Sequence, residues 1–448
     1  MLRHVLTTAT ILAAVAGPAA AQGTFDTSLD LAEAVLLARD NSLAAQQNRQ
    51  QLKVTEADRS VAVSSVLPSV SLQTAANYNR LPASQAAAFG GSGGFGGVVG
   101  FPTSGTSVDT TISAQQVIFD AFATRDTLAI YDQQLRIGAL AVQQAEQEAM
   151  ANTAVAYFDV LRSEGLAGVS ADGVKQAAEH LRLGDLRMKA GTGTRAEVLQ
   201  LRAQLANAQG NLTQARNAVN IARMNLANLL NAPVGDRPLA TAPVVPPLPV
   251  DLARDLAPGV DRRPEVQTLL AKTEADQTRV SQESRALWPN LTATSSYSQR
   301  DLNEGQFGAG LKVSWALFDS FKVRNRMESA LNSARVDQIQ AEQARQRVAL
   351  EIRQQYQTRE EAKTRILSAR EGLASAQEAY RLAVKRYKVG VATTFEVTDV
   401  QNTLIQSGNN YVQALNDMRA SEVRLAKALG LDLAEYLAGK HAAKPLKS

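Results

Sequence analysis

Large apolar residues recur at every seventh position over long stretches in both halves of the chain. In the second half these residues are Val397, Leu404, Tyr411, Met418 and Leu425. In the first half they are Val198, Leu205, Leu212, Val219 and Leu226. In the second half a companion row three positions later carries mainly Ala and Ser. A period of seven sustained over this length predicts coiled-coil packing, in which the small row lets a neighbouring helix approach closely.

Each heptad segment follows a longer segment that also favours helix. The segment 319–388 contains no proline, and at ~1.5 Å per residue a helix of this length reaches roughly 100 Å. The segment 120–189 is equally long, although Gly165, Gly168, Gly173 and Gly184 weaken its helical propensity. Each segment ends at a glycine, Gly191 or Gly390, in a short turn. The sequence therefore predicts two long antiparallel helical hairpins, at 120–230 and 319–429.

Four shorter segments alternate apolar and small polar residues, which predicts β-strands at 69–80, 108–119, 290–300 and 307–318. Segments of ~10 residues with one apolar face match transmembrane barrel strands, although each one alone fits a soluble, half-buried hairpin equally well. Four strands do not close a barrel, and open sheet edges are not tolerated in lipid. Two chains would supply eight strands around a filled interior, whereas three would supply twelve around an aqueous lumen. A conduit therefore favours a homotrimer.

The chain is a tandem duplication. Ile118-Phe119-Asp120 recurs as Leu317-Phe318-Asp319, and Lys189-Ala190-Gly191 recurs as Lys388-Val389-Gly390, both displaced by 199 positions (319 − 120 and 390 − 191). Pro68 matches Pro289 with a displacement of 221 positions. The first half therefore has 22 additional residues between Pro68 and Phe119 (221 − 199), in the region where residues 90–100 form a glycine-rich loop.

This period predicts the domain organisation. After a signal peptide at 1–21, the first structural repeat covers 22–235 and a Pro-rich, extended linker covers 236–264. The second structural repeat covers 265–436, and a tail covers 437–448.

The N-terminus predicts export. Arg3 and His4 precede an apolar stretch at 5–16, and Ala19-Ala20-Ala21 supplies a cleavage site before Gln22. This pattern is typical of a cleaved signal peptide, with an uncleaved anchor as the alternative. The chain contains no cysteine, which excludes a lipid anchor on an N-terminal Cys.

Composition argues against an enzyme. Across 448 residues, 47 Lys and Arg face 43 Asp and Glu, and this net charge of +4 is too small to indicate nucleic acid as a partner. The absence of Cys excludes thiolate nucleophiles, disulfides and Cys-ligated metals, and only three His occur. His180, next to Glu179, has no second ligand at helical spacing and is interpreted as a surface histidine. We expect no cofactor, no metal and no catalytic residue.

The whole pattern resembles the TolC-like outer-membrane efflux and secretion channels. The resemblance rests on the duplicated helix–strand–strand–helix halves, the Phe-Asp pair after the second strand, and two turns followed by Glu-Val, Met188-Lys189-Ala190-Gly191 and Tyr387-Lys388-Val389-Gly390. Residues 31–41 are also similar to the opening helix of that family, with Ser42 where Pro is usual.

The resemblance implies a mainly α fold with a β-barrel part. Three chains would share a twelve-strand barrel in the lipid of the cell outer membrane, continued by a twelve-helix tunnel in the periplasm. A periplasmic adaptor and an inner-membrane transporter would dock at the tunnel tip. The protein would be the passive exit duct of a tripartite efflux pump or of a type I secretion system. The alternative is a non-transporting periplasmic coiled-coil scaffold.

The resemblance also implies the residues at the tunnel tip. Tyr387 matches the gating Tyr of the family, Glu197 its carboxylate partner, and Glu396 and Asp399 the acidic pair that selects ions. Ala392 stands where the family has its gating Arg. Read from the sequence alone, Glu396 and Asp399 are three positions apart at a helix start, where acids also suit the helix dipole.

Overall fold

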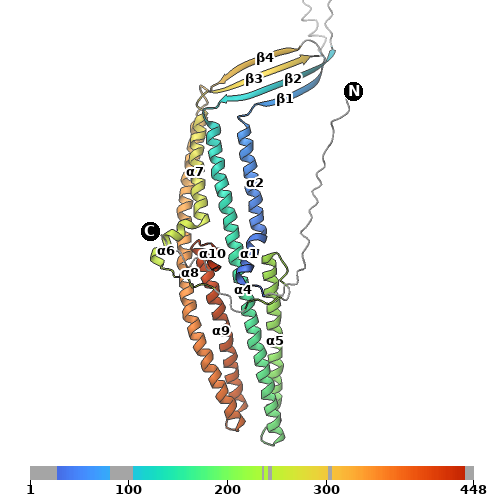
Figure 1. Cartoon of the computed structure of the whole chain (residues 1–448), viewed down its shortest axis with the longest axis vertical. Helices are drawn as coiled ribbons and strands as arrows, with labels where there is room; N and C mark the ends of the chain where they lie inside the picture. The colour runs from blue at the N-terminus through green and yellow to red at the C-terminus, as the bar shows by residue number, and fades with distance from the viewer. Residues whose placement is uncertain (1–27, 81–103, 235–236, 241–244, 301–304, 439–448) are drawn as a thin grey trace, which may run out of the picture.

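The computed structural model describes residues 28–80, 104–234, 237–240, 245–300 and 305–438. The predicted signal peptide and the glycine-rich loop at 90–100 lie outside the described residues. The protein is a long rod of helices with one β-sheet at its end (Figure 1). In chain order the elements are α1 (Leu31–Asn41), α2 (Leu43–Ser64), β1 (Ser69–Arg80), β2 (Ser104–Phe119), α4 (Ala123–Lys189), α5 (Arg195–Leu230), α6 (Leu252–Arg262), α7 (Pro264–Arg285), β3 (Asn290–Arg300), β4 (Gln306–Ser314), α8 (Lys322–Lys388), α9 (Thr394–Ala428) and α10 (Leu433–Leu437).

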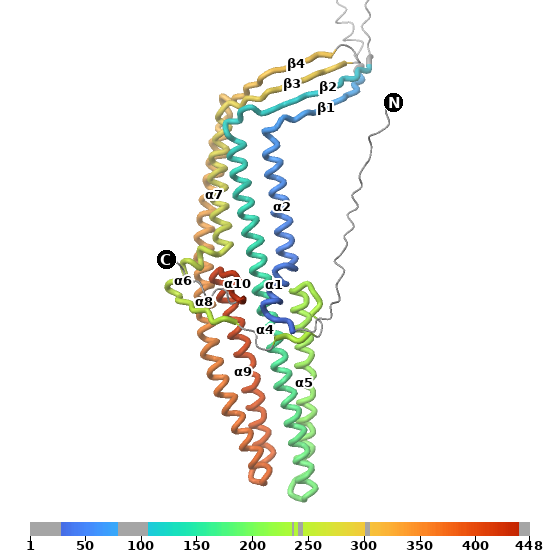
Figure 2. The backbone as a smooth tube through the Cα atoms, viewed as in Figure 1, coloured from blue at the N-terminus to red at the C-terminus, as the bar shows by residue number. Residues whose placement is uncertain are grey.

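Two helical hairpins, α4–α5 and α8–α9, make up most of the rod. The long helices α4 and α8 have 67 residues each, and they run from the sheet to the opposite end of the molecule (Figure 2). Near the sheet, α2 packs against α4, and α7 packs against both α4 and α8. The prediction of a mainly helical fold with long antiparallel hairpins and four strands is confirmed. No helix within the described ranges is long and apolar enough to cross a membrane.

The four strands form one antiparallel sheet in the order β1-β2-β3-β4, so the pairing of β2 with β3 joins the two repeats. β2 has a neighbour on both sides and continues to Phe119, whereas β4 has one neighbour and ends at Ser314, short of the predicted 307–318. After β4 the indole Nε1 of Trp315 donates to the carbonyl oxygen of Leu287 at 3.0 Å, which turns the chain toward the helices.

Each repeat passes from its second strand into its long helix through the same bend. Phe119 packs edge-to-face on Phe122 with ring centroids 5.8 Å apart, and Asp120 Oδ2 accepts a hydrogen bond from the N–H of Thr124 at 2.7 Å. The corresponding residues 199 positions later make the same contacts at 6.0 and 2.8 Å. The two residues after each Asp have positive φ, 55° and 69° in the first repeat and 56° and 64° in the second. Such non-glycine residues cost ~1–3 kcal/mol each, and the ring contact and the helix cap offset that strain.

The linker between the repeats, predicted to be extended, contains the helix α6. The carboxylate of Asp251 caps it by accepting from the N–H of Ala253 at 3.0 Å. Gly259 of α6 lies so close to α8 that an added Cβ would be 3.2 Å from the Ile352 side chain. The cap and this packing explain how a proline-rich segment holds a helix despite Pro258 within it.

The largest apolar core surrounds the middle of the rod, where α1, α6 and α10 pack on the hairpins. Among its buried members are Tyr157, Phe158, Leu226, Ile352 and Leu425. Arg359 of α8 is also buried there, and it donates to Glu422 at 2.9 Å and to the carbonyl oxygen of Leu248 at 2.7 Å. Through the hydrogen bond to Leu248, Arg359 connects the linker to the second hairpin.

Glycines let α4 and α9 approach closely along the seam between the hairpins. A Cβ added at Gly165 would lie 2.6 Å from Cγ1 of Val412, and one added at Gly173 would lie 3.1 Å from Cδ1 of Ile405. Gly408 of α9 receives a side chain of α4 in the same way. Gly165 and Gly173, which weaken the helical propensity of α4, therefore serve the packing between the two repeats.

We expect Gly165→Ala to destabilise the protein, because the added methyl group overlaps the rigid Val412 side chain. Overpacking costs about 1–3 kcal/mol, which exceeds the ~1 kcal/mol that Ala gains over Gly inside a helix. Gly168→Ala is the matched control and should be neutral or stabilising, since no described residue of another helix lies within 4 Å of the position of its Cβ. Thermal unfolding in detergent, followed by circular dichroism, checks both. An unfolding midpoint for Gly165→Ala at or above that of Gly168→Ala contradicts the packing argument.

Candidate functional site at the hairpin ends

The two hairpins close through the same glycine turn. Gly191 and Gly390 have φ of +75° and +79°, a conformation that side chains with a Cβ rarely adopt. In the first turn the N–H groups of Thr192 and Gly193 donate to the carbonyl oxygen of Arg187 at 3.0 and 3.1 Å. The second turn repeats this on Arg386 at 3.0 and 3.3 Å. Both turns thus satisfy the last carbonyls of a long helix and reverse the chain.

The glutamates that follow the two turns have different partners. Glu197 completes a capping box: its Oε2 accepts from the N–H of Thr194 at 3.0 Å, and its own N–H donates to Thr194 Oγ1 at 3.2 Å. Glu396 is capped by Thr393 in the same way, but its carboxylate accepts from Nη1 of Arg386 at 2.7 Å. This exposed ion pair is screened by solvent, so it orients Glu396 more than it stabilises the fold.

Tyr387 lies in a small apolar cluster at the hairpin ends and is 3% exposed. Its hydroxyl accepts from Oγ1 of Thr394 at 3.4 Å, and the Arg187 guanidinium stands 4.7 Å from its ring centroid. Arg187 belongs to α4, so this cation–π contact joins the first hairpin to the second. The resemblance implied Glu197 as the partner of Tyr387, whereas the described hydrogen-bond and cation–π partners of its side chain are Thr394 and Arg187.

Ala392, at the position of the family's gating Arg, belongs to the same cluster and is 4% exposed. The position is occupied by buried apolar packing, so an arginine there would lose its hydration. The cation that does reach the acidic pair is Arg386, which lies on α8 before the turn.

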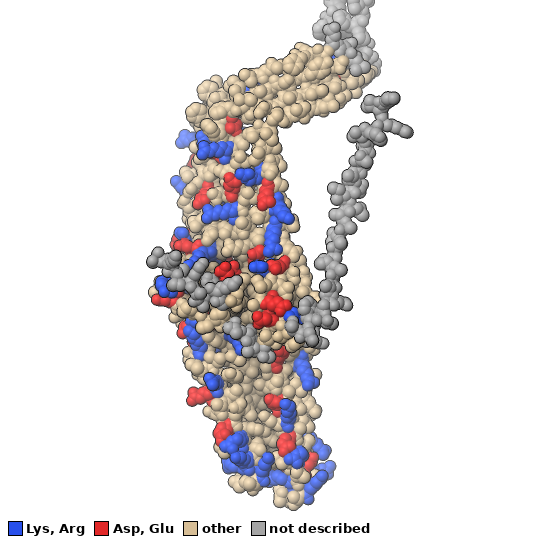
Figure 3. Space-filling view, in the orientation of Figure 1, with Lys and Arg blue, Asp and Glu red and all other residues tan. Residues whose placement is uncertain are grey.

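Asp399 is exposed one helical turn after Glu396, and no ion pair of its carboxylate occurs among the described residues. The surroundings are basic, and the end of the rod is rich in Lys and Arg (Figure 3). Exposed cations there are Lys189, Arg195, Lys385, Arg386 and Lys388. Of the two acids implied by the resemblance, Asp399 is therefore free and Glu396 is neutralised locally.

His180 was interpreted as a surface residue, and this prediction is wrong. It is 3% exposed on α4, and its Nε2 lies 2.9 Å from the hydroxyl of Tyr380 on α8. Burial lowers the pKa of His180, and a hydrogen bond that its ring donates to Gln401 of α9 partly opposes this; burial also raises the pKa of Tyr380 to about 12. The charged neighbour on its own helix, Glu179, is already paired with Arg182. A neutral histidine therefore bridges the two hairpins.

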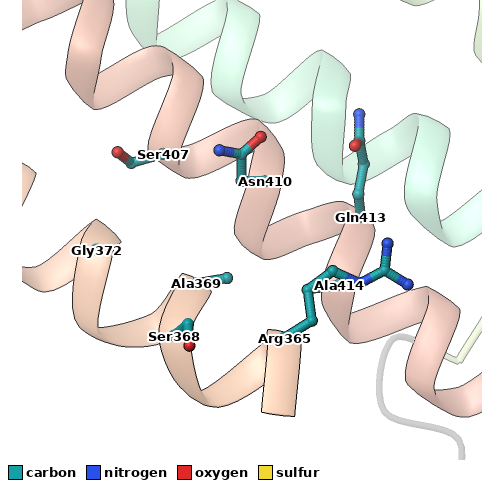
Figure 4. A pocket seen from close by; sticks show the side chains of 8 residues that line it. All are labelled: Arg365, Ser368, Ala369, Gly372, Ser407, Asn410, Gln413 and Ala414. Carbon is teal, nitrogen blue, oxygen red and sulfur yellow. The ribbon is translucent and has the colours of Figure 1, made fainter. Parts of the chain in front are cut away.

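A shallow hollow of about 400 Å³ lies between α8 and α9 (Figure 4). Small and polar side chains line it, among them Ser368, Gly372, Ser407 and Asn410. Its one titratable group is Arg365, which pairs with Asp417 at 3.4 Å. No cluster of three metal-ligating side chains occurs in the described part of the chain. The residues that line the hollow include no base that could activate its serine hydroxyls, and the hollow lies where two rows of small residues face each other.

Stability should depend on pH through His180. Its pKa is lowered from 6.5 in the folded state, so the contribution is complete above pH 6.5 and is lost as the pH falls, because the unfolded chain takes up the proton first. We expect the wild-type protein to lose on the order of 1 kcal/mol between about pH 7.5 and 5.5, whereas His180→Gln should lose less. Thermal unfolding across this range measures the two slopes. His441→Gln in the tail is the control, and equal slopes for His180→Gln and wild type would disprove the assignment.

The chain matches the outer membrane efflux protein family over residues 34–232 and 260–431. The outer membrane efflux protein BepC of Brucella suis biovar 1 (strain 1330) is 24% identical over 430 residues, which cover 92% of this chain and 89% of that protein. The Campylobacter jejuni CmeC outer membrane channel superposes with a TM-score of 0.77 at 15% identity, covering 90% of this chain and 86% of that one. For the outer membrane protein VceC of Vibrio cholerae the TM-score is 0.73 at 16% identity, covering 89% and 96%.

These similarities confirm the family resemblance drawn from the duplicated halves and their turns. They decide against an enzyme, and also against a scaffold that transports nothing. The chain belongs to the outer membrane efflux protein family, as an outer membrane efflux channel of tripartite efflux pumps.

Proposed function

We propose that three copies of this chain form one continuous exit duct, which conducts substrates passively from the periplasm to the outside. The observation that carries the proposal is a sheet with two open edges and two different faces. One face presents exposed apolar side chains, among them Val70, Leu72, Phe307, Leu311 and Val313. The register places Ser71 opposite Ser113 and Thr294 opposite Gly310 on the other face. An apolar outer face and a polar inner face suit a closed sheet in lipid.

The open edges of the sheet support an assembly of several copies. β1 and β4 each have a neighbour on one side only, and unpaired backbone groups are costly in lipid. Pairing β1 of one copy with β4 of the next removes both edges. Three copies of a four-stranded sheet supply twelve strands, enough for an aqueous lumen, whereas eight would be filled by side chains.

The helices also have faces that need cover. On α8, Val336, Ile339 and Leu367 are exposed, and on α5, Leu199 and Met224 are exposed. These helices are the outer members of the two hairpins, since α4 and α9 form the seam between them. Packing α5 of one copy against α8 of the next would cover both faces and close a helical tunnel below the sheet.

The hairpin ends would receive the remaining pump components. Val389, Val391 and Phe395 are 74%, 68% and 73% exposed around the second turn, an apolar surface for a periplasmic adaptor and an inner-membrane transporter. The predicted signal peptide at 1–21 would direct export, and cargo would be chosen by the transporter. A type I secretion system would use the same duct.

Cysteine cross-linking tests the trimer, since the natural chain has no cysteine. β1 and β4 are opposite edges within one chain, so a disulfide between Gln73→Cys and Gly310→Cys requires two copies. We expect oxidation to produce dimers and trimers on denaturing gels, with neighbouring β4 positions substituted in turn to find the register. Gln73→Cys combined with Ser296→Cys on β3 is the control and should remain monomeric. A detergent-solubilised monomer with no cross-link at any β4 position refutes the proposal.

Ion selectivity tests the acidic pair at the tip. Three copies of Asp399 around a narrow passage would attract cations, whereas Glu396 is held by Arg386. We therefore expect Asp399→Asn to lower cation selectivity and to weaken block by multivalent cations in single-channel recordings, and Glu396→Gln to have the smaller effect. Unchanged selectivity in Asp399→Asn would show that these residues act only as helix-start charges.

A further inference from the structure

We infer that Lys312 forms a ring of three ammonium groups inside the sheet, which binds polyvalent anions on their way through the duct. The inference rests on the proposed trimeric duct. It concerns the sheet, which lies at the other end of the molecule from the acidic residues of the hairpin tip, and the part of the sheet next to the helices. Lys312 is the third residue from the end of β4, and α8 begins at Lys322.

The strand register places Lys312 on the polar face. It lies opposite Thr292, and the next pairs on that face are Thr294 with Gly310 and Ser296 with Gly308. Successive residues of a strand point to opposite faces, so the apolar neighbours of Lys312 point to the other side. If the apolar face meets lipid, the exposed Lys312 side chain lies in the lumen. The glycines along β4 leave the space next to it free of side chains.

No carboxylate on the described sheet neutralises Lys312. The other charged side chains described on the strands are Asp109 and Arg300, whose Oδ1 and Nε are 3.2 Å apart. Asn77 occupies the second oxygen of Asp109 at 3.2 Å. Lys312 itself makes no ion pair within the described residues.

Assembly would leave that charge uncompensated. A second copy would cover β4 with its own β1, and the segment 69–80 contains no Asp or Glu. The first acidic residue after Lys312 along the chain, Asp319, accepts the hydrogen bond that caps α8. Threefold symmetry would therefore place three unpaired cations around one lumen, where low-dielectric walls strengthen their field.

The ring would contain three lysines and not six, because only one repeat of each chain contributes. The residue that corresponds to Lys312 in the first repeat is Ser113 (312 − 199), which pairs with Ser71 through a 2.8 Å hydrogen bond between hydroxyls. The ring would also be distant from the tip acids, because the 67 residues of α8 separate them by about 100 Å. An anion added from the sheet side would meet Lys312 first, so the two sites can be told apart.

Planar-bilayer recordings with inorganic triphosphate added on the sheet side test the ring. We expect triphosphate to reduce the wild-type current, and Lys312→Gln to raise the concentration for half-block by about threefold or more, because three charges leave the lumen together. Lys312→Glu should abolish the block and shift the reversal potential toward cation preference.

Two control variants separate the ring from general charge effects. Asp109→Asn with Arg300→Gln removes a neutral pair from the same face, and Lys322→Gln removes a lysine at the start of α8; both should keep the wild-type block. If Lys312→Gln and Lys312→Glu are blocked as strongly as wild type, the ring is refuted and the duct stands. If wild-type protein forms no conductance, the proposed duct itself fails.

Discussion

The close approach of α4 to α9 holds the two repeats together along the rod, and the remaining structure depends on it. At the seam, glycines of one helix face branched side chains of the other: Gly165 meets Val412, and Val169 lies against Gly408. Gln401 then donates to the carbonyl oxygen of Gly173 at 3.3 Å, a contact that a bulkier seam would prevent. Because the backbones are this near, His180 and Tyr380 can bridge the hairpins while buried, and Arg187 can reach Tyr387 at the tip.

At the sheet end, the repeats are joined by backbone pairing of β2 with β3. The bend that places each long helix below its strand introduces local backbone strain. Two consecutive non-glycine residues at positive φ occur in each repeat, after Asp120 and after Asp319. The same aromatic contact and the same helix cap accompany the strain both times. Strain that recurs with its compensation indicates a bend required by the architecture.

The regular elements could be predicted because their signals are local and repeated. Long proline-free segments, heptads and strict alternation each extend over ten or more residues, and the duplication supplies each signal twice.

The features that the sequence did not predict depend on contacts between residues that are not adjacent in sequence. Nothing near His180 in sequence indicates burial, since its partner Tyr380 is 200 residues away. The 307–318 strand ends early because its described partner β3 begins at Asn290, which pairs with Ser314. The linker was predicted to be extended from its prolines, but the Asp251 cap and packing on α8 hold a helix there. Likewise, no local pattern shows that Arg386 neutralises Glu396.

Positions that the two repeats share and positions at which they differ have separate physical roles. The shared positions build the frame: the glycine turns, the Phe-Asp bends and the threonine caps occur in both halves with nearly equal geometry. Where the halves differ, charge is redistributed. Arg187 and Arg386 correspond at the offset of 199, yet one stacks on Tyr387 and the other binds Glu396. Asp399 corresponds to Gln200, so its free carboxylate occurs once per chain. In a trimer of this duplicated chain, the backbone of the wall would therefore have nearly sixfold symmetry, whereas its charges would have only threefold symmetry. The electrostatic field of the duct would depend on the few residues that differ between the repeats.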